Sequence, residues 1–202
     1  MEENINNIQP STPEPSPEGL NWAKEIFEWV ACIAVAIVIA LLIKNFIFTL
    51  VKVDGESMHP TLAHGDKLFT RVIGYNQPEY GDIVIFNPPL SAYNKQPNKD
   101  IAYVKRVIAV EGQIVDITPD GNVSVDGKVI EEDYISEPIN MRYLLTTEFP
   151  FEVPEDTVFV LGDNRNNSHD SRSADVGAVP LDNIIGKAEF RLWPITKFNL
   201  YK

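Results

Sequence analysis

A β-hairpin is predicted by the stretch Gln113-Ile-Val-Asp-Ile-Thr118-Pro-Asp120-Gly121-Asn122-Val-Ser-Val-Asp126. Runs of β-branched residues are typical of strands, and the Asp-Gly pair between them tolerates the positive φ angles of tight hairpin turns. Similar short runs occur at Asp82–Phe86, Ala102–Val110, Thr157–Leu161 and Glu189–Trp193. The chain after residue 50 is therefore predicted to be mainly β, an antiparallel β-sheet domain.

An apolar run ahead of this region predicts one N-terminal transmembrane helix. Every residue from Trp29 to Ile43 is apolar, and the apolar character resumes after a two-residue interruption. The stretch approaches the ~20 residues that a spanning helix needs, so residues 24–50 are assigned to a membrane anchor. A cleaved signal peptide fits less well, because its first segment would be short and basic, whereas this one is long and acidic. In the β-rich region, Leu181–Ile185 is the sole candidate helix.

Composition divides the chain further and excludes several classes of function. Prolines interspersed with Ser, Thr and Glu mark residues 1–23 as a disordered tail, which leaves residues 51–202 as the folded domain. The net charge of −12 argues against a nucleic-acid partner, which would attract a basic surface. A single cysteine, Cys32, excludes an intrachain disulfide and a zinc site built from several thiolates. No cofactor and no metal are expected.

Three polar or charged segments could carry chemistry: Val53–Leu62, Tyr103–Ile108 and the wholly polar Gly162–Arg172. In the second, Lys105 and Arg106 lie among apolar residues of a predicted strand. Either one could be the solvent-facing residue of an amphipathic strand, which is what the pattern alone favours. The alternative is a lysine held near apolar surface, where desolvation lowers its pKa and the neutral amine can act as a general base.

These segments resemble motifs of the bacterial type I signal peptidases, which are membrane-anchored serine proteases. Ser57-Met-His-Pro-Thr61 is similar to the family's S-M-x-P-T motif, and Gly81–Phe86 to its G-D-x-V-x-F strand. Tyr103–Ile108 is similar to the Y-[IV]-K-R strand, and Gly162–Arg172 to the G-D-N-R-x-N-S-x-D-S-R box. The four motifs follow the family's order, and the compact length resembles the Gram-positive branch.

The resemblance implies a Ser-Lys dyad that needs no histidine. Ser57 would be the nucleophile and Lys105 the general base. Ser168 would contact and orient Lys105, and Asp170 and Arg172 would form a supporting ion pair. The alternative, a catalytic histidine, would have to use His59 or His169, which occupy variable positions inside the motifs.

The resemblance also implies a substrate class, namely signal-peptide-bearing preproteins cut after small residues of the A-x-A type. The residues near the dyad in sequence that could line the substrate pockets, or equally be ordinary core, are Val53, Met58, Leu62, Tyr103 and Val104. Gly55 stands where some members have a serine that helps the oxyanion hole. The backbone N–H of Ser57 is then expected to be the main oxyanion donor.

Partners and location follow from the same resemblance. The expected partners are preproteins and the lipid bilayer, the expected state is a monomer, and the catalytic domain is placed on the extracytoplasmic side. The lysines that follow the apolar run point the other way under the positive-inside rule. A Ser-Lys autoproteolytic repressor would need a DNA-binding domain that residues 1–28 cannot form. A membrane-tethered β domain that binds partners without catalysis is the alternative function.

Overall fold

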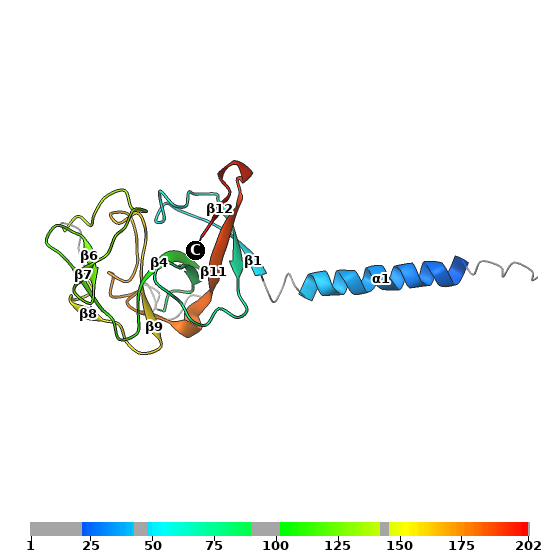
Figure 1. Ribbon diagram of the computed structural model, residues 1–202, viewed down its shortest axis with the longest axis horizontal. Helices are drawn as coiled ribbons and strands as arrows, with labels where there is room; N and C mark the ends of the chain where they lie inside the picture. Colours follow the sequence, from blue (N-terminus) through cyan, green and yellow to red (C-terminus); the bar gives the residue numbers. More distant parts are fainter. Residues whose placement is uncertain (1–21, 43–47, 90–101, 142–145, 202) are drawn as a thin grey trace, which may run out of the picture. The chain divides into compact units, whose positions relative to one another are not determined.

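The computed structural model describes residues 22–42, 48–89, 102–141 and 146–201 (Figure 1). The chain divides into two compact units, residues 1–40 and residues 41–202. The predicted disordered tail, residues 1–23, lies outside the described residues except for its last two residues, which are helical.

The first unit contains all but the last two residues of the helix α1, Trp22–Leu42. Its segment has no glycine or proline, and Glu25 lies in the first turn, where a negative charge interacts favourably with the helix dipole. The large apolar side chains of α1 are exposed around the helix, among them Phe27, Trp29 and Ile33. A helix is therefore present where the apolar run predicted one, but it spans Trp22–Leu42 and not residues 24–50.

The structure does not bear out the predicted transmembrane anchor over residues 24–50. Among the described residues, no helix has both the length and the hydropathy needed to cross a membrane. Charged residues occupy the first two turns of α1, and the uncharged part, Trp29–Leu42, covers about 21 Å at the usual rise per residue. The predicted end at residue 50 is also wrong, because Phe48–Lys52 pair with Lys67–Arg71 as neighbouring strands.

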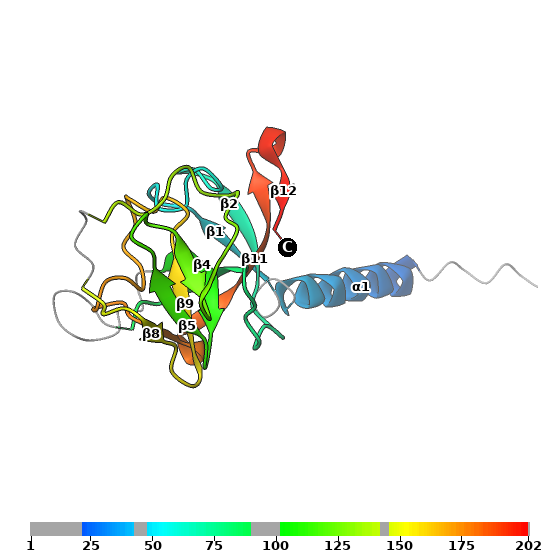
Figure 2. The same cartoon turned by 60° about the vertical axis from the view of Figure 1, so that its left-hand side comes forward.

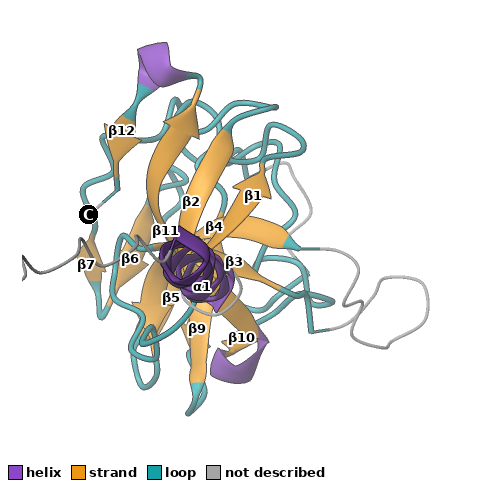
Figure 3. Ribbon diagram, turned by 90° about the vertical axis from the view of Figure 1, so that its right-hand side faces the viewer, coloured by secondary structure: helices purple, strands orange, loops and turns teal. Residues whose placement is uncertain are grey.

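The second unit is built on two antiparallel sheets (Figure 3). The larger sheet has the order β1-β2-β11-β3-β4-β9-β10, with β12 paired to β11. Its strands are β1 (Phe48–Lys52), β2 (Lys67–Arg71), β3 (Ile83–Phe86), β4 (Tyr103–Val110), β9 (Thr157–Leu161), β10 (Val179–Pro180), β11 (Ile184–Trp193) and β12 (Asn199–Leu200). The smaller sheet has the order β7-β6-β5-β8, and its strands are β5 (Ile114–Ile117), β6 (Val123–Val125), β7 (Lys128–Val129) and β8 (Phe151–Glu152). The predicted mainly β, antiparallel class is confirmed.

The predicted hairpin is β5 and β6 of the smaller sheet. Val115 pairs with Val125 and Ile117 with Val123, and Gly121 in the turn has a φ of 81°. A side chain at this glycine would also meet the backbone oxygen of Ile139 at 1.9 Å, so the position admits only glycine on two counts.

β4 lies inside the larger sheet, between β3 and β9. Figure 2 shows β4 beside β9. Lys105 pairs with Val84 of β3, and Arg106 pairs with Ile83. Lys105 is 4% exposed and Arg106 9% exposed, so neither is the solvent-facing residue that the alternating pattern favoured. Both cations are buried because other segments cover the two faces of β4: Ser57 lies against Lys105, and Asp163 lies against Arg106.

The segment before β11 differs from its prediction. Leu181–Asn183 form a single 3₁₀ turn, η2, and Ile184 already belongs to β11, so the expected helix over Leu181–Ile185 is wrong. β11 extends the predicted strand Glu189–Trp193 towards its N-terminus, because it pairs with both β2 and β3. After β11, a second 3₁₀ turn, η3 (Ile195–Lys197), leads into β12.

Candidate active site

Ser57 lies in the segment Val53–Leu62 that follows β1, called the serine segment below, and residues on both sides of it are buried in the core. Val53, Met58 and Leu62 are buried in one apolar cluster with Leu68 and other residues of the larger sheet. The N–H of Leu62 donates to the carbonyl of Met58 at 2.8 Å, which closes one turn directly after the serine. The buried side chains on either side of Ser57 therefore fix the position of its hydroxyl.

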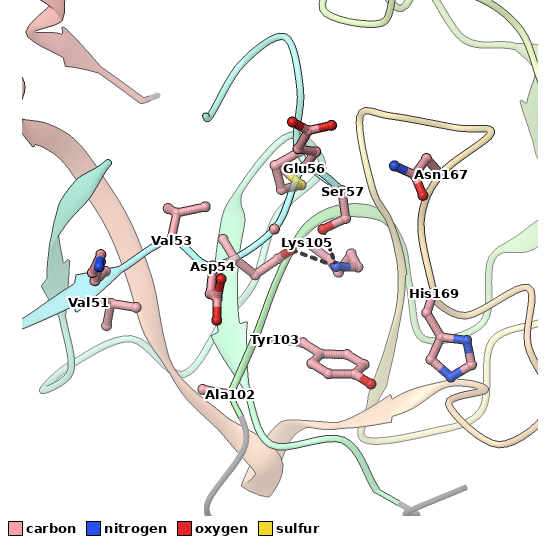
Figure 4. A pocket seen from close by; sticks show the side chains of 14 residues that line it. Val51, Val53, Asp54, Glu56, Ser57, Ala102, Tyr103, Lys105, Asn167 and His169 are labelled. Carbon is pink, nitrogen blue, oxygen red and sulfur yellow. Dashed lines mark hydrogen bonds between the residues drawn. The ribbon is translucent and has the colours of Figure 1, made fainter. Parts of the chain in front are cut away.

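Lys105 extends from β4 to this hydroxyl (Figure 4). Its Nζ lies 2.8 Å from Ser57 Oγ and 3.0 Å from the backbone oxygen of Val104. Burial lowers the pKa of the Lys105 amine to about 8, although the negative charges of Asp170 and Asp163 act in the opposite direction. A neutral amine in hydrogen-bond contact with a serine hydroxyl is the arrangement that a serine nucleophile and its general base require.

The polar box that follows β9 holds the serine segment from its other side. The Asn164 N–H donates to the backbone oxygen of Ser57 at 3.0 Å, and Asn164 Nδ2 donates to that of Glu56 at 3.1 Å. Gly162 lies against the same place, since a Cβ there would be 2.4 Å from the Ser57 oxygen and 2.2 Å from Ser168 Oγ. The sequence motifs predicted that this box belongs to the site, but not that Gly162 and Asn164 contact the serine segment.

The predicted ion pair between Asp170 and Arg172 is present. Arg172 Nε and Nη2 each donate to a carboxylate oxygen at 2.8 Å, and the Gly162 N–H donates to the same carboxylate at 2.9 Å. Burial by itself would raise the pKa of the Asp170 carboxyl, but the hydrogen bonds and the charge of Arg172 lower it below its ordinary value. The Asp170 carboxylate therefore joins Gly162 and Arg172, the two ends of the box.

Ser168 does not make the contact that the resemblance implied. The described residues show no hydrogen bond from its buried Oγ to Lys105 or to any other group. The hydroxyl lies close enough to Asp170 to help lower the pKa of that carboxyl, but not in the geometry of a hydrogen bond.

A second buried ion pair, which the sequence reasoning missed, lies next to the dyad. Arg106 donates to both carboxylate oxygens of Asp163, at 2.9 and 2.7 Å, and Thr61 donates to the same carboxylate. Arg106 also donates to the Gly81 backbone oxygen at 2.9 Å. The contact joins β4, the serine segment and the box, so the residue beside Lys105 has a structural partner. Arg106 and Asp163 are oppositely charged residues of two motifs to which the sequence analysis gave no role, and this could have suggested that they form a pair.

A cleft of about 760 Å³ opens beside the dyad. It is lined by Val51, Lys52, Val53, Asp54, Gly55, Glu56, Ser57, Met58, Ala102, Tyr103, Val104, Lys105, Asn167 and His169 (Figure 4). Four of the predicted pocket residues therefore line it. The fifth, Leu62, does not: it is fully buried in the core beneath the serine segment, because the turn after Ser57 points it inward.

The two histidines within the motifs lie apart from the dyad. His59 is exposed, and the described residues give it no polar contact with Ser57 or Lys105. His169 lies on the cleft wall, where its Nε2 is 2.9 Å from Asp175 and its ring meets that of Tyr103 edge-on at 6.2 Å. The structure therefore gives no support to a catalytic role for either histidine.

The sequence of the chain is similar to those of known signal peptidases. A family model described as signal peptidase, peptidase S26, matches residues 26–193. A signal peptidase I of Leptolyngbya laminosa is 37% identical over 94% of this chain and 88% of its own length. Signal peptidase I S of Bacillus subtilis is 35% identical over 89% of this chain and 96% of its own length. A crystal structure of a signal peptidase I from Enterococcus faecalis aligns with a TM-score of 0.41 and 29% identity, over 55% of this chain and 96% of that one.

Proposed function

The chain belongs to the signal peptidase family of peptidase S26, and we propose that it is a serine endopeptidase that removes signal peptides from exported preproteins. One observation supports the serine endopeptidase chemistry. A buried lysine amine with a lowered pKa lies 2.8 Å from the hydroxyl of a serine that lines an open cleft.

In the proposed mechanism, the neutral Lys105 amine takes the proton of Ser57 as Oγ attacks the scissile carbonyl carbon. The resulting ammonium returns that proton to the leaving amine, so that an acyl-enzyme on Ser57 remains. Lys105 then deprotonates a water molecule that hydrolyses the acyl group. With a pKa of about 8, about a tenth of the amine is neutral at pH 7, against ~0.04% for a lysine of ordinary pKa.

The surroundings of the dyad are proposed to assist this chemistry. The backbone N–H of Ser57 is the proposed oxyanion donor, since Gly55 supplies no hydroxyl. The Asp170–Arg172 ion pair and the buried Ser168 hydroxyl support the box around Lys105. The Ser57 N–H stabilises the charge of the oxyanion, whereas the other groups act on the geometry of the site, and none of them transfers a proton to the substrate.

We further propose that the cleft prefers small side chains next to the cut. Val53 and Met58 line the cleft beside Ser57 and are 4% and 1% exposed, so their side chains are packed in the core and cannot easily move aside. A large substrate side chain would have to displace these core residues, and forcing extra volume into a packed core costs free energy.

We expect the purified chain to hydrolyse a fluorogenic peptide with alanine at the first and third positions before the cut. Replacing the alanine directly before the cut with leucine should lower kcat/KM by about 100-fold or more, because the wall cannot accommodate the larger side chain. Cleavage rates are followed by fluorescence, and mass spectrometry gives the cut position. Equal rates for both peptides would contradict the proposed pocket, and no hydrolysis of either would favour the non-catalytic binding module.

The pH dependence should follow the ionisation of Lys105. Since the neutral amine is the base and the pKa of Lys105 is lowered to about 8, kcat/KM should be level above that pH. Below it, kcat/KM should fall about tenfold per pH unit, because the ammonium cannot accept a proton. Steady-state kinetics from about pH 6 to about pH 10 measure the profile. A profile that is flat down to the lower limit would show that Lys105 is not the base.

We further propose that the β domain acts on the extracytoplasmic side, where signal peptides emerge, and that the exposed apolar surface of α1 associates with the membrane. An apolar surface of this kind is unfavourable in water.

If the domain lies on the extracytoplasmic side, externally added protease should digest it in intact cells from which the wall has been removed. Protection of the domain would place it on the other side.

A further inference from the structure

His64 holds the backbone of the serine segment two residues before Ser57. Val53 and the segment around Gly65 form a short backbone ladder, in which the Val53 N–H donates to Asp66 at 2.8 Å and the Gly65 N–H donates to Val53 at 2.9 Å. The His64 side chain extends this ladder, since the Gly55 N–H donates to His64 Nδ1 at 3.2 Å. A ring nitrogen thus replaces the next backbone acceptor.

Gly55 needs such a contact more than an ordinary loop residue does. Its φ of 96° is a conformation that is open mainly to glycine, the residue with the greatest freedom to adopt other conformations. Gly55, Glu56 and Ser57 all line the cleft. Rotation of the backbone at Gly55 would therefore shift the peptide that leads directly to the nucleophile.

The same ring nitrogen also faces a carboxylate. His64 Nδ1 lies 3.2 Å from Asp54 Oδ1, and the described residues place no other acidic group within ion-pair distance of the ring. The charged neighbours along the same cleft wall are Lys52 and Glu56. When the ring is neutral with its proton on Nε2, Nδ1 accepts from Gly55. When the ring is protonated, Nδ1 becomes a donor that can bind only Asp54.

We propose that His64 is a positioning residue for the nucleophile: its neutral ring fixes Gly55, and protonation exchanges that contact for the one with Asp54. The proposal rests on the proposed peptidase function for its kinetic consequence, but its structural part does not depend on catalysis. The effect should appear in kcat rather than KM, because the contact orients Ser57 and does not bind the substrate.

The kinetic test compares His64→Ala with His64→Asn. Asparagine Oδ1 can accept from the Gly55 N–H much as Nδ1 does, and it does not titrate. At about pH 8.5, His64→Ala should lower kcat by about fivefold, the worth of one hydrogen bond, while His64→Asn should stay close to the wild type. The exposed His59 provides a matched control, and His59→Ala should leave kcat unchanged.

A second comparison isolates the protonation. The ratio of the wild-type rate to the His64→Asn rate cancels the ionisation of Lys105, which both proteins share. This ratio should fall severalfold between about pH 8.5 and about pH 5.5, because only the wild-type ring becomes charged. A constant ratio, or wild-type kcat in His64→Ala, would overturn the proposal.

A readout without catalysis separates this inference from the proposed function. In full-length Ser57→Ala, the amide proton of Gly55 should shift in NMR spectra with the same pH midpoint as the His64 ring. The His64→Asn variant on the same background should abolish that shift. If the Gly55 amide and the His64 ring titrate independently, the inference is overturned even if the chain is an active peptidase. If they titrate together in a chain without peptidase activity, the inference is supported although the proposed function fails.

Discussion

Replacing Lys105 with methionine should lower kcat/KM for a cleavable peptide by about 10⁴-fold or more. Methionine fills a similar volume but cannot accept a proton, so no base takes the Ser57 proton as Oγ attacks. The rate of peptide hydrolysis by purified wild type and Lys105→Met is the measurement. Turnover retained within tenfold of the wild type would rule out the proposed base.

The same substitution should leave the fold intact and make it more stable. Lys105 is 4% exposed, and its pKa falls from 10.5 to about 8 on folding. Below that pH the amine is charged in both states, so the folded state carries a desolvation cost of up to ~3 kcal/mol that methionine removes. The cost disappears as the pH rises above the ordinary lysine pKa, where the amine is neutral in both states.

Ser57→Ala is the matched control for this stability effect. It should remove activity to the same extent, since the nucleophile is gone, but it leaves the buried amine in place with one hydrogen-bond partner fewer, so the fold should gain no stability. Urea unfolding of the three proteins near neutral pH compares the free energies. Inactivation of Lys105→Met accompanied by a loss of stability would indicate that the lysine supports the fold instead.

Replacing Gly162 with alanine should lower kcat by about 10²- to 10³-fold. The new Cβ would lie 2.2 Å from Ser168 Oγ and 2.4 Å from the Ser57 backbone oxygen, much closer than van der Waals contact. The serine segment or the box must move, and the 2.8 Å contact between Ser57 and Lys105 depends on both. Steady-state kinetics at a temperature well below unfolding measures the effect.

Gly186→Ala separates a displaced dyad from a weakened fold. A Cβ at Gly186 would meet the Arg71 backbone oxygen at 2.2 Å, so the clash is of the same severity, but it lies between β11 and β2. Both variants should lose thermal stability, whereas only Gly162→Ala should lose most of its kcat. A similar loss of kcat in both would mean that Gly162 acts through overall stability.

The candidate site could be anticipated from short motifs, since Ser57, Lys105 and the polar box each follow a local pattern. The burial of Lys105 could not be anticipated in this way. An alternating strand allows either Lys105 or Arg106 to face solvent, and the choice depends on what covers each face of β4. The box from residue 162 onward supplies Asp163 as a partner for Arg106, and no pattern within β4 predicts that contact.

Six of the strands, β3, β4, β5, β6, β9 and β11, were readable from residues close together in the chain. Alternation of β-branched residues, and an Asp-Gly pair able to adopt positive φ, impose the β5–β6 hairpin through neighbours alone. Other features depended on segments far apart in sequence. Phe48–Lys52 form a strand although they continue an apolar run, because their backbone groups pair with β2. Leu62 belongs to the core because the sheet covers it, and Lys105 reaches Ser57 because β4 and the serine segment meet in three dimensions. Local sterics act within a few residues, whereas burial and pairing are settled only when the whole chain has packed.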